Sequence, residues 1–305
     1  MHSDIKKLEH SGLNRAYIEK EYPPVKYEVK DEAIEKYALA YGSKNVIYFR
    51  NSGKFEMIAP PIFAVVFELP LLERIFFDEG LHGGKDQMSQ NLLMLVHGEQ
   101  DMRFYEPIKP GDIITSRAKI KSIEDKGSGE VFVVNVASDN QKGEKVVESD
   151  WGIFVRGIGS GARKEKSTQT QEQTDANPIP IAFRTVIRVP KDITSQYAEA
   201  SGDRNPIHID EKVAKAAGLG GIIVHGLCTM AMTMKAIVEG YLDGEPTKIK
   251  RLGVRFAHPV YPGDTLIVEG GKTGKQDTRT VLGFEVRRER DGVKVIKNGI
   301  VDVEI

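Results

Sequence analysis

Two stretches of this sequence occur twice, and no other feature constrains the fold as strongly. Residues 37–45 (YALAYGSKN) line up with residues 197–205 (YAEASGDRN), and residues 103–112 (RFYEPIKPGD) line up with residues 255–264 (RFAHPVYPGD). Pro-Gly-Asp alone is a common turn, but the Arg-Phe pair at the same distance upstream in both copies argues against chance. Two matches in the same order indicate an internal duplication, so we expect two similar domains.

The border between the two expected domains is marked by a change in composition. Residues 163–177 carry almost no apolar side chain, so this segment cannot bury enough surface to offset its loss of conformational entropy. We therefore predict a linker over residues 158–180, between an N-terminal domain of residues 1–157 and a C-terminal domain of residues 181–305. The length of 305 residues fits two domains of about 150 residues each.

Each half shows a helical pattern first and a series of strands after it. The helical candidates are residues 62–77 and residues 227–241. Alternating apolar and polar residues, separated by turn residues, predict strands over residues 113–120, 131–137, 145–155, 265–269, 280–286 and 293–303. A long helix wrapped by an antiparallel meander is an α+β architecture, which we expect twice in this chain.

The charge balance excludes several classes of partner. The formal net charge is −1, so the molecule as a whole has no field that would attract nucleic acid or an anionic membrane. An anionic ligand would have to be held by a local group of donors. The apolar stretch over residues 58–72 is interrupted by prolines and a glutamate, and it is too short to span a bilayer.

Cysteine usage and the two ends of the chain bear on its compartment. The single cysteine, Cys228, excludes an internal disulfide and a multi-cysteine metal site, and we expect it to be a buried thiol in an apolar helix. Residues 1–20 lack the apolar core of a signal peptide, and residues 301–305 (VDVEI) do not match a peroxisomal signal. The expected location is therefore cytoplasmic.

The densest group of polar residues is the segment 201–208 (SGDRNPIH). A helix is expected to end at Gly202, so that Asp203, Asn205 and His208 share one tight loop. A carboxylate and an imidazole in one loop suit general acid–base catalysis, because one group can take a proton from water while the other delivers one. The alternative is a plain turn, since Asp, Asn and Pro are turn formers, but a turn alone gains nothing from His208.

A second candidate element follows at Gly226. A short apolar strand over residues 222–225 is expected to run into this glycine, and the helix over residues 227–241 follows at once. A glycine at a helix N-terminus lets a ligand approach unpaired backbone N–H groups, which can act as an oxyanion hole. The alternative of equal weight is that the glycine only allows the helix to pack closely on the sheet.

The two elements, residues 203–208 and His225-Gly226, resemble the signature of the MaoC-like enoyl-CoA hydratases of type 2, which are R-specific. The resemblance covers nearly the whole chain. Residues 37–39, 95–100, 125–129 and 255–263 are also similar to the hydratase domain of the peroxisomal multifunctional enzyme type 2. The resemblance implies a double hotdog fold, in which two hotdog domains are fused and the N-terminal one has lost its catalytic residues.

The resemblance also implies roles for individual residues. Asp203 and His208 would hold the reacting water, and Asn205 would help to position them. The Gly226 N–H would bind the thioester oxygen. The family's contacts with CoA would fall on His97, Gly98, Lys126 and Phe256. Lys126 lies beside two glycines, where a cation and exposed backbone could meet a phosphate. The alternative is an ordinary hairpin lysine. His97-Gly98 is expected to open a strand.

The activity implied by the resemblance is the reversible hydration of a trans-2-enoyl-CoA thioester to (3R)-3-hydroxyacyl-CoA. We expect the chain to act as a homodimer and to need no metal ion and no other cofactor. Two other functions stay open: a hotdog acyl-CoA thioesterase, which would direct water at the carbonyl carbon, and a non-catalytic acyl-CoA-binding protein. Free CoA as a product would distinguish the thioesterase from the hydratase.

The N-terminal copy lacks the residues on which this chemistry depends. Ser43 stands where the second copy has Asp203, and Tyr48 stands where it has His208. The pKa values of both hydroxyl groups lie far above neutrality, so they cannot replace a carboxylate and an imidazole. We therefore predict one active site per chain, with the N-terminal half serving as a wall of the ligand site. Its helix over residues 62–77 is expected to be irregular because of its prolines, which could leave room for a long acyl tail.

Overall fold

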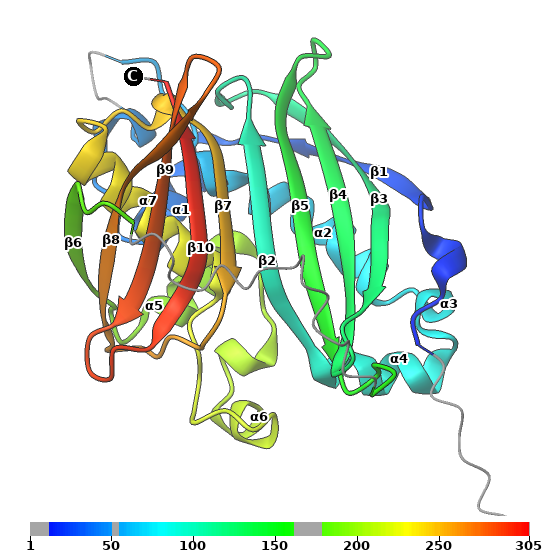
Figure 1. Cartoon of the computed structure of the whole chain (residues 1–305). Helices are drawn as coiled ribbons and strands as arrows, with labels where there is room; N and C mark the ends of the chain where they lie inside the picture. The colour runs from blue at the N-terminus through cyan, green and yellow to red at the C-terminus, as the bar shows by residue number, and fades with distance from the viewer. Residues whose placement is uncertain (1–11, 51–54, 162–178, 305) are drawn as a thin grey trace, which may run out of the picture.

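The described part of the chain forms one large antiparallel sheet with helices packed on one side. The computed structural model describes residues 12–50, 55–161 and 179–304. The strand order is β1-β3-β4-β5-β2-β7-β10-β9-β8-β6, so the five strands of each half are neighbours and the halves meet at β2 and β7 (Figure 1). Most of the predicted linker lies outside the described residues, and its bounds remain a prediction.

The strands agree with the alternating patterns in the sequence. Their bounds are β1 (Glu21–Glu28), β2 (Leu95–Phe104), β3 (Ile113–Asp125), β4 (Gly129–Asp139), β5 (Lys145–Arg156), β6 (Phe183–Arg188), β7 (Ile249–Phe256), β8 (Thr265–Gln276), β9 (Arg279–Arg288) and β10 (Lys294–Val303). All six predicted strands are confirmed, most with longer bounds. His97 is the third residue of β2, so the expectation that His97-Gly98 opens a strand is confirmed. The strands β1, β6 and β7 were not predicted.

The two halves are joined by main-chain pairing as well as by side-chain packing. Strand β2 pairs with β5 on one side and with β7 on the other, with Gln100 opposite Val254 and Met102 opposite Leu252 across the β2–β7 border. Over residues 99–103, β2 is therefore paired along both edges, and the two half-sheets continue into one another.

The helices fill the concave side of the sheet. They are α1 (Asp31–Ala40), α2 (Val65–Phe76), α3 (Glu79–His82), α4 (Lys85–Met94), α5 (Ile193–Ser201), α6 (Glu211–Ala216) and α7 (Gly226–Tyr241). In Figure 1, α2 lies behind the strands of the N-terminal half and α7 behind those of the C-terminal half. The predicted helix over residues 62–77 begins as the 3₁₀ helix η3 (Pro61–Ala64) and carries Pro70 within α2, so it is irregular as expected.

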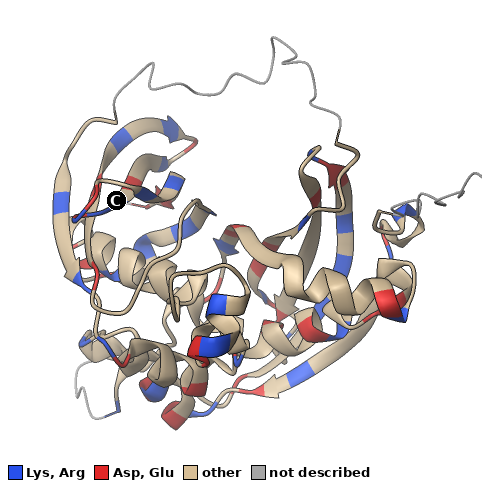
Figure 2. Ribbon diagram, turned by 90° about the horizontal axis from the view of Figure 1, so that it is seen from below, with Lys and Arg blue, Asp and Glu red and all other residues tan. Residues whose placement is uncertain are grey.

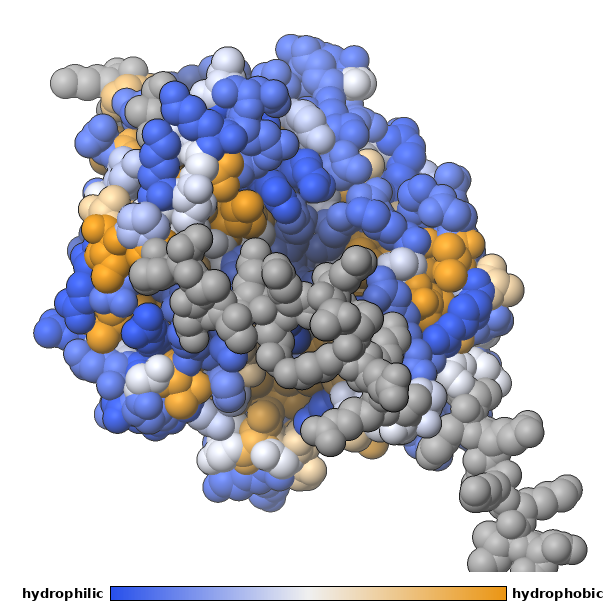
Figure 3. Space-filling model, in the orientation of Figure 1, coloured by the Kyte–Doolittle hydropathy of each residue, from blue (hydrophilic) through white to orange (hydrophobic). Residues whose placement is uncertain are grey.

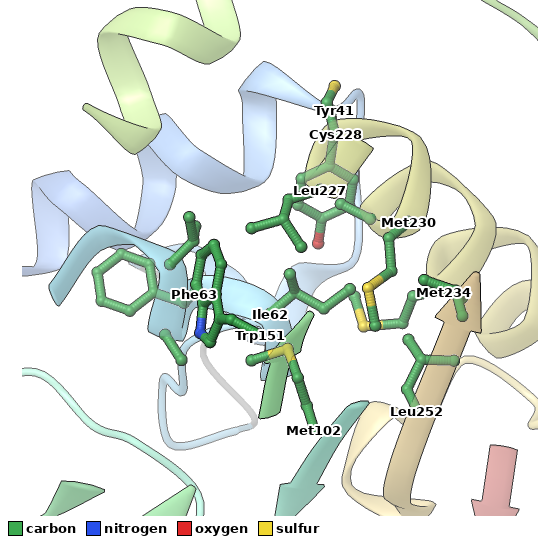
Figure 4. Close-up of a cluster of buried hydrophobic side chains, with 14 of the residues drawn as sticks. Tyr41, Ile62, Phe63, Met102, Trp151, Leu227, Cys228, Met230, Met234 and Leu252 are labelled. Carbon is green, nitrogen blue, oxygen red and sulfur yellow. The ribbon is translucent and has the colours of Figure 1, made fainter. Parts of the chain in front are cut away.

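One hydrophobic core runs through both halves. Figure 4 shows Phe63 and Trp151 of the N-terminal half in the same cluster as Leu227 and Met230 of the C-terminal half. Cys228 is fully buried in this core, and burial raises the pKa of its thiol, as expected for an unreactive cysteine. The helices α1 and α5 also pack on each other across the halves.

The outer surface has the opposite character. The visible described residues on the face of the sheet shown in Figure 3 are mostly hydrophilic. Lysine, arginine, aspartate and glutamate are interspersed over the molecule in the view of Figure 2, as expected from a formal net charge of −1. Within the described residues, no helix is both long enough and apolar enough to cross a membrane.

Candidate active site

The polar loop between α5 and α6 is held by its own side chains. Helix α5 ends as predicted at Gly202, which adopts a left-handed φ of 85° and donates its N–H to Ala198. The Asn205 Oδ1 accepts from the Ile207 N–H (3.3 Å) and so caps the 3₁₀ helix η4 (Pro206–His208). The Asp203 Oδ1 accepts from the Asn205 N–H (3.1 Å). These local bonds fix the path of the loop between the two proposed catalytic residues.

His208 is held in one tautomer by its hydrogen bond. Its Nδ1 lies 2.8 Å from the carbonyl oxygen of Ile223, and because a carbonyl can only accept, Nδ1 carries the hydrogen. The lone pair of the neutral ring is then on Nε2. His208 is 7% exposed, and burial lowers its pKa, while the nearby Asp203 carboxylate partly raises it again. The ring is therefore neutral at neutral pH, with a basic nitrogen available.

Gly226 is the first residue of α7, as the sequence predicted, but the expected strand before it is wrong. Residues 222–225 belong to no sheet. They run extended, with the Ile223 N–H bonded to Ile207 (3.3 Å) and the Val224 N–H bonded to Val260 (2.8 Å). A Cβ added at Gly226 would lie 3.2 Å from the Phe256 ring. Glycine at this position thus allows both the close approach of Phe256 and access to the helix N-terminus.

A series of ring contacts links this glycine to the N-terminal half. The His97 ring stacks on Trp151 (centroids 5.0 Å apart, 12° between planes) and meets Phe256 edge to face (5.1 Å). Desolvation lowers the pKa of His97 to about 4, so its ring is neutral. The Trp151 Nε1–H donates to Glu68 Oε2 (2.7 Å) in α2. His97 of the N-terminal half therefore contacts Phe256, the ring that lies against Gly226.

The other two proposed CoA contacts lie differently. Gly98 sits at an irregularity of the β2–β5 pairing, next to His97. Lys126 lies in the turn between β3 and β4, where its N–H bonds to Gly129 (2.9 Å) and its Nζ pairs with Glu124 (2.5 Å). Among the contacts of the described residues, none brings Lys126 to the loop of residues 203–208.

His225 is a residue of this site that sequence reasoning did not assign a role. Its ring stacks on His208 with centroids 3.9 Å apart and 28° between the planes, and its Nε2 lies 3.1 Å from the Asp203 carbonyl oxygen. The signal available in the sequence was its position directly before Gly226, but the contacts with residues far back in the chain could not be inferred from spacing.

Asp203, His208 and His225 also form a group of three possible metal ligands, with ligand atoms within 4.8 Å of one another. The sequence alone indicated no such cluster. However, the two imidazole rings are stacked, so the lone pairs of their nitrogens run in nearly parallel planes. A zinc ion needs nitrogen lone pairs that converge on one point about 2.0–2.1 Å from each ligand atom. We therefore assign no metal-binding role to this group.

Two family profiles match the two halves of the chain. The profile described as "MaoC like domain" matches residues 165–293, and the profile described as "FAS1-like, dehydratase domain region" matches residues 16–149. Together they account for both copies of the duplicated sequence.

Individual relatives agree with these profiles. The chain is 28% identical to the "Probable enoyl-CoA hydratase 2" of Dictyostelium discoideum, over 92% of this chain and 93% of that protein. It is 33% identical to the "Peroxisomal multifunctional enzyme type 2" of Mus musculus, over 88% of this chain but only 35% of that longer protein. A solved structure from Mycobacterium tuberculosis, described as a double hotdog, superposes over 94% of this chain with a TM-score of 0.60 at 13% identity. The predicted double hotdog fold is confirmed.

Proposed function

This chain is a hydro-lyase of the MaoC-like dehydratase family, and we propose that it adds water to a trans-2-enoyl-CoA thioester to give the (3R)-3-hydroxyacyl-CoA. The chain spans about a third of the mouse multifunctional enzyme but nearly all of the Dictyostelium hydratase. The proposal therefore concerns the hydration step alone.

The observation that carries the proposal is the orientation of His208. Its Nδ1–H is bound to the Ile223 carbonyl, so the free lone pair is on Nε2, and burial keeps the ring neutral. A neutral imidazole with a free nitrogen can take a proton from water. Asp203, on the same loop, offers a carboxylate that can accept the other hydrogen of that water molecule. Asn205 contributes by holding the loop through its bond to Ile207.

The atoms balance in a single addition of water. One O–H bond of the water breaks, the oxygen bonds to C3 of the enoyl group, and the proton passes to C2 on the same face. The electrons of the double bond move transiently to the thioester oxygen. The Gly226 N–H at the start of α7 would bind this oxygen, aided by the positive end of the helix. Removal of one such donor typically costs about 3 kcal/mol of barrier.

The CoA part would lie against residues from both halves. His97, Gly98 and Phe256 are close to one another beside Gly226, which supports a contact with the thioester end of CoA. Lys126 stays a proposed phosphate contact, for which it would exchange Glu124 for the phosphate. We also propose a homodimer in the cytoplasm, which light scattering of the purified protein and fractionation of the source cells would test.

The test is a hydration assay that follows the loss of enoyl absorbance on short, long, branched and dicarboxylic enoyl-CoAs. We expect at least one of them to be hydrated without release of free thiol. Coupling to an S-specific hydroxyacyl-CoA dehydrogenase should give no signal, because the product is expected to be the 3R isomer. Release of free CoA would favour the thioesterase instead. No turnover over the whole panel would favour a non-catalytic acyl-CoA-binding protein.

A further inference from the structure

His225, at the N-terminus of α7, contacts two other rings. It is the N-cap residue of this helix and is 1% exposed. Its ring meets that of Tyr197 of α5 at a tilt of 49° (centroids 5.0 Å apart) and stacks on that of His208 (3.9 Å). The His225 ring therefore lies against the ring of His208, the proposed catalytic base.

The hydrogen bonds of His225 fix its tautomer. Its Nε2 lies 3.1 Å from the carbonyl oxygen of Asp203, which can only accept, so Nε2 carries the hydrogen. The other nitrogen, Nδ1, is then a buried acceptor, and it has no hydrogen-bond partner among the described residues. A buried acceptor without a partner costs free energy, so a phenylalanine would fill this space at a lower cost. Packing alone therefore does not explain an imidazole at this position.

We infer that His225 is a positioning residue, which sets the spacing between Asp203 and His208 by contacting both of them. The inference rests on the proposed hydration. The ring donates to the main chain of Asp203, and its face supports the flat side of the His208 ring. Within the described residues the His208 ring makes one hydrogen bond, at Nδ1, and a second ring against its face further restricts rotation about its side-chain bonds. A shift of about 1 Å between reacting groups can lower a rate by about 100-fold.

The electrostatics of the pair agree with this role. Burial, together with the neighbouring His208, lowers the pKa of His225 to about 4, while Asp203 partly raises it. His225 therefore stays neutral when His208 takes a proton during turnover. It presents a neutral ring face to the imidazolium and not a second positive charge.

The N-terminal half holds Tyr197, the tyrosine whose ring contacts His225, by a hydrogen bond. The hydroxyl groups of Tyr197 and Tyr37 lie 2.9 Å apart, and the Tyr37 hydroxyl donates to the carbonyl oxygen of Ile62 (3.2 Å). Tyr37 and Tyr197 occupy equivalent positions in the two copies of the duplicated sequence. The series of ring contacts from His208 through His225 to Tyr197 thus ends on a hydrogen bond between the halves.

Three substitutions separate the two contacts of His225. His225→Phe keeps a ring face and removes the N–H donor, His225→Gln keeps a donor of similar reach and removes the ring, and His225→Ala removes both. We expect kcat to fall about 10-fold or more in the Phe and Gln variants and further in the Ala variant, with KM nearly unchanged, since the substrate does not bind this ring. A structural role alone would lower stability without this split between kcat and KM.

The matched control is His82→Phe. His82 is also a fully buried imidazole whose Nε2 lies 2.9 Å from a backbone carbonyl, that of Phe76, but it belongs to the N-terminal half. Its replacement should lower the melting temperature and leave kcat per folded molecule unchanged. If His225→Phe and His225→Gln behave like His82→Phe, or change KM alone, the inference is wrong.

Three other outcomes are decisive. If all three His225 variants fail to fold while His82→Phe folds, His225 serves the fold only and the inference is overturned. If the unaltered protein hydrates none of the enoyl-CoAs, the proposed function itself fails, and the inference fails with it. An active protein with unaffected His225 variants would refute the inference while leaving the hydration intact.

Discussion

In the N-terminal half, Asn45 caps the 3₁₀ helix η2 (Val46–Tyr48) by accepting from the Ile47 N–H, and in the C-terminal half Asn205 caps η4 by accepting from the Ile207 N–H. Both distances are 3.3 Å. The residue two positions earlier accepts from the asparagine N–H in both halves: Ser43 Oγ at 3.3 Å and Asp203 Oδ1 at 3.1 Å. A serine therefore builds this loop as well as an aspartate does, so the fold does not require the carboxylate of Asp203.

At this loop and at the start of the following helix, the two halves differ in the groups that could take part in the reaction. Tyr48, where the other half has His208, is 2% exposed, and burial raises its pKa. The main-chain hydrogen bond from Ala59 to Ile108 is equivalent to that from Val224 to Val260. Two residues further along each copy, Pro61 therefore occupies the position that is equivalent to Gly226. Proline has no N–H, so the N-terminal half also lacks the donor for a thioester oxygen. The scaffold of the loop is therefore present in both halves, and the groups proposed to react are present in the C-terminal half alone.

Among the differences between the halves, the Asp203 and His208 pair should have the largest effect on turnover. Asp203→Asn or His208→Ala should lower turnover at least ~100-fold, because each removes a group that handles the same water. The double variant should be little worse than either single one. Initial rates of enoyl-CoA hydration and melting temperatures of the same preparations would measure both effects.

The matched controls for the dyad are Ser43→Ala and Tyr48→Phe in the N-terminal half. They should leave turnover near normal. Residual activity in His208→Ala that disappears when Tyr48 is also changed would contradict the asymmetry. A stoichiometry of two in a titration with a tight product analogue would contradict it as well.

A second test exchanges the residues at the helix starts. Gly226→Pro should lower kcat by about 100-fold, because it removes one donor to the developing oxyanion. Pro61 already occupies the first position of η3, so a proline at the start of a helix fits this scaffold. Gly226→Ala is the control, since it keeps the N–H and places a Cβ against Phe256 like the proline does. If both variants lose the same activity, crowding and not the donor is responsible. Pro61→Gly should create no activity.

Many features of the fold and of the candidate site could be predicted from the sequence. The alternating apolar patterns located six strands, because one face of each is buried; in β4, for example, Phe132, Val134 and Val136 point into the core. The duplicated motifs allowed Ser43 and Asp203 to be compared position by position. Gly202 was predicted as a helix end because glycine readily adopts the left-handed conformation that often ends a helix, and it does so here.

Other features depend on contacts that no local pattern records. Strand β1 contains two adjacent prolines, and β6 carries the apolar Val186 at an exposed position, so the apolar–polar alternation of both sequences is broken. The apolar residues 222–225 resemble a strand, but they pair with no strand because they lead directly into the N-cap of α7. The contacts of His225 with Asp203 and His208, and the hydrogen bond between Glu68 and Trp151, join residues that are far apart in the sequence. Glu68 and Trp151 are 83 positions apart.

A third test uses the one imidazole that distinguishes the two loops. Burial lowers the pKa of His208 below its usual 6.5, so His208 should keep its basic lone pair to lower pH than a free imidazole. The acidic fall of kcat/KM should therefore lie below about pH 6.5. The free energy of unfolding should also decrease as pH falls through this window, because the unfolded chain binds the proton more tightly. A pH–rate profile and an NMR titration of His208 would measure both, and an acidic limb above pH 6.5 would contradict the assignment.

The last test concerns the N-terminal half, in which we predict no active site, and it should have the smallest effect on activity. Glu68 in α2 is fully buried, and it accepts bonds from the Ser149 hydroxyl (2.8 Å) and from Trp151 (2.7 Å). Burial raises its pKa from 4.5 to about 8, although both bonds oppose this shift. Thr233 occupies the equivalent position of α7, so the C-terminal half carries no such group in its helix.

Between about pH 4.5 and about pH 8, the folded protein holds a proton on Glu68 that the unfolded chain releases. The free energy of unfolding should therefore fall as pH rises through this range, by roughly 5 kcal/mol at most, and level off above pH 8. Glu68→Gln keeps an acceptor for Trp151 and removes the titration, so its melting temperature should lose this dependence while kcat stays near normal. Thr233→Val is the control, and it should keep the pH dependence of the unaltered protein. If Glu68→Gln melts with the same pH dependence as the unaltered protein, the buried carboxyl of the N-terminal half is not protonated as its burial indicates.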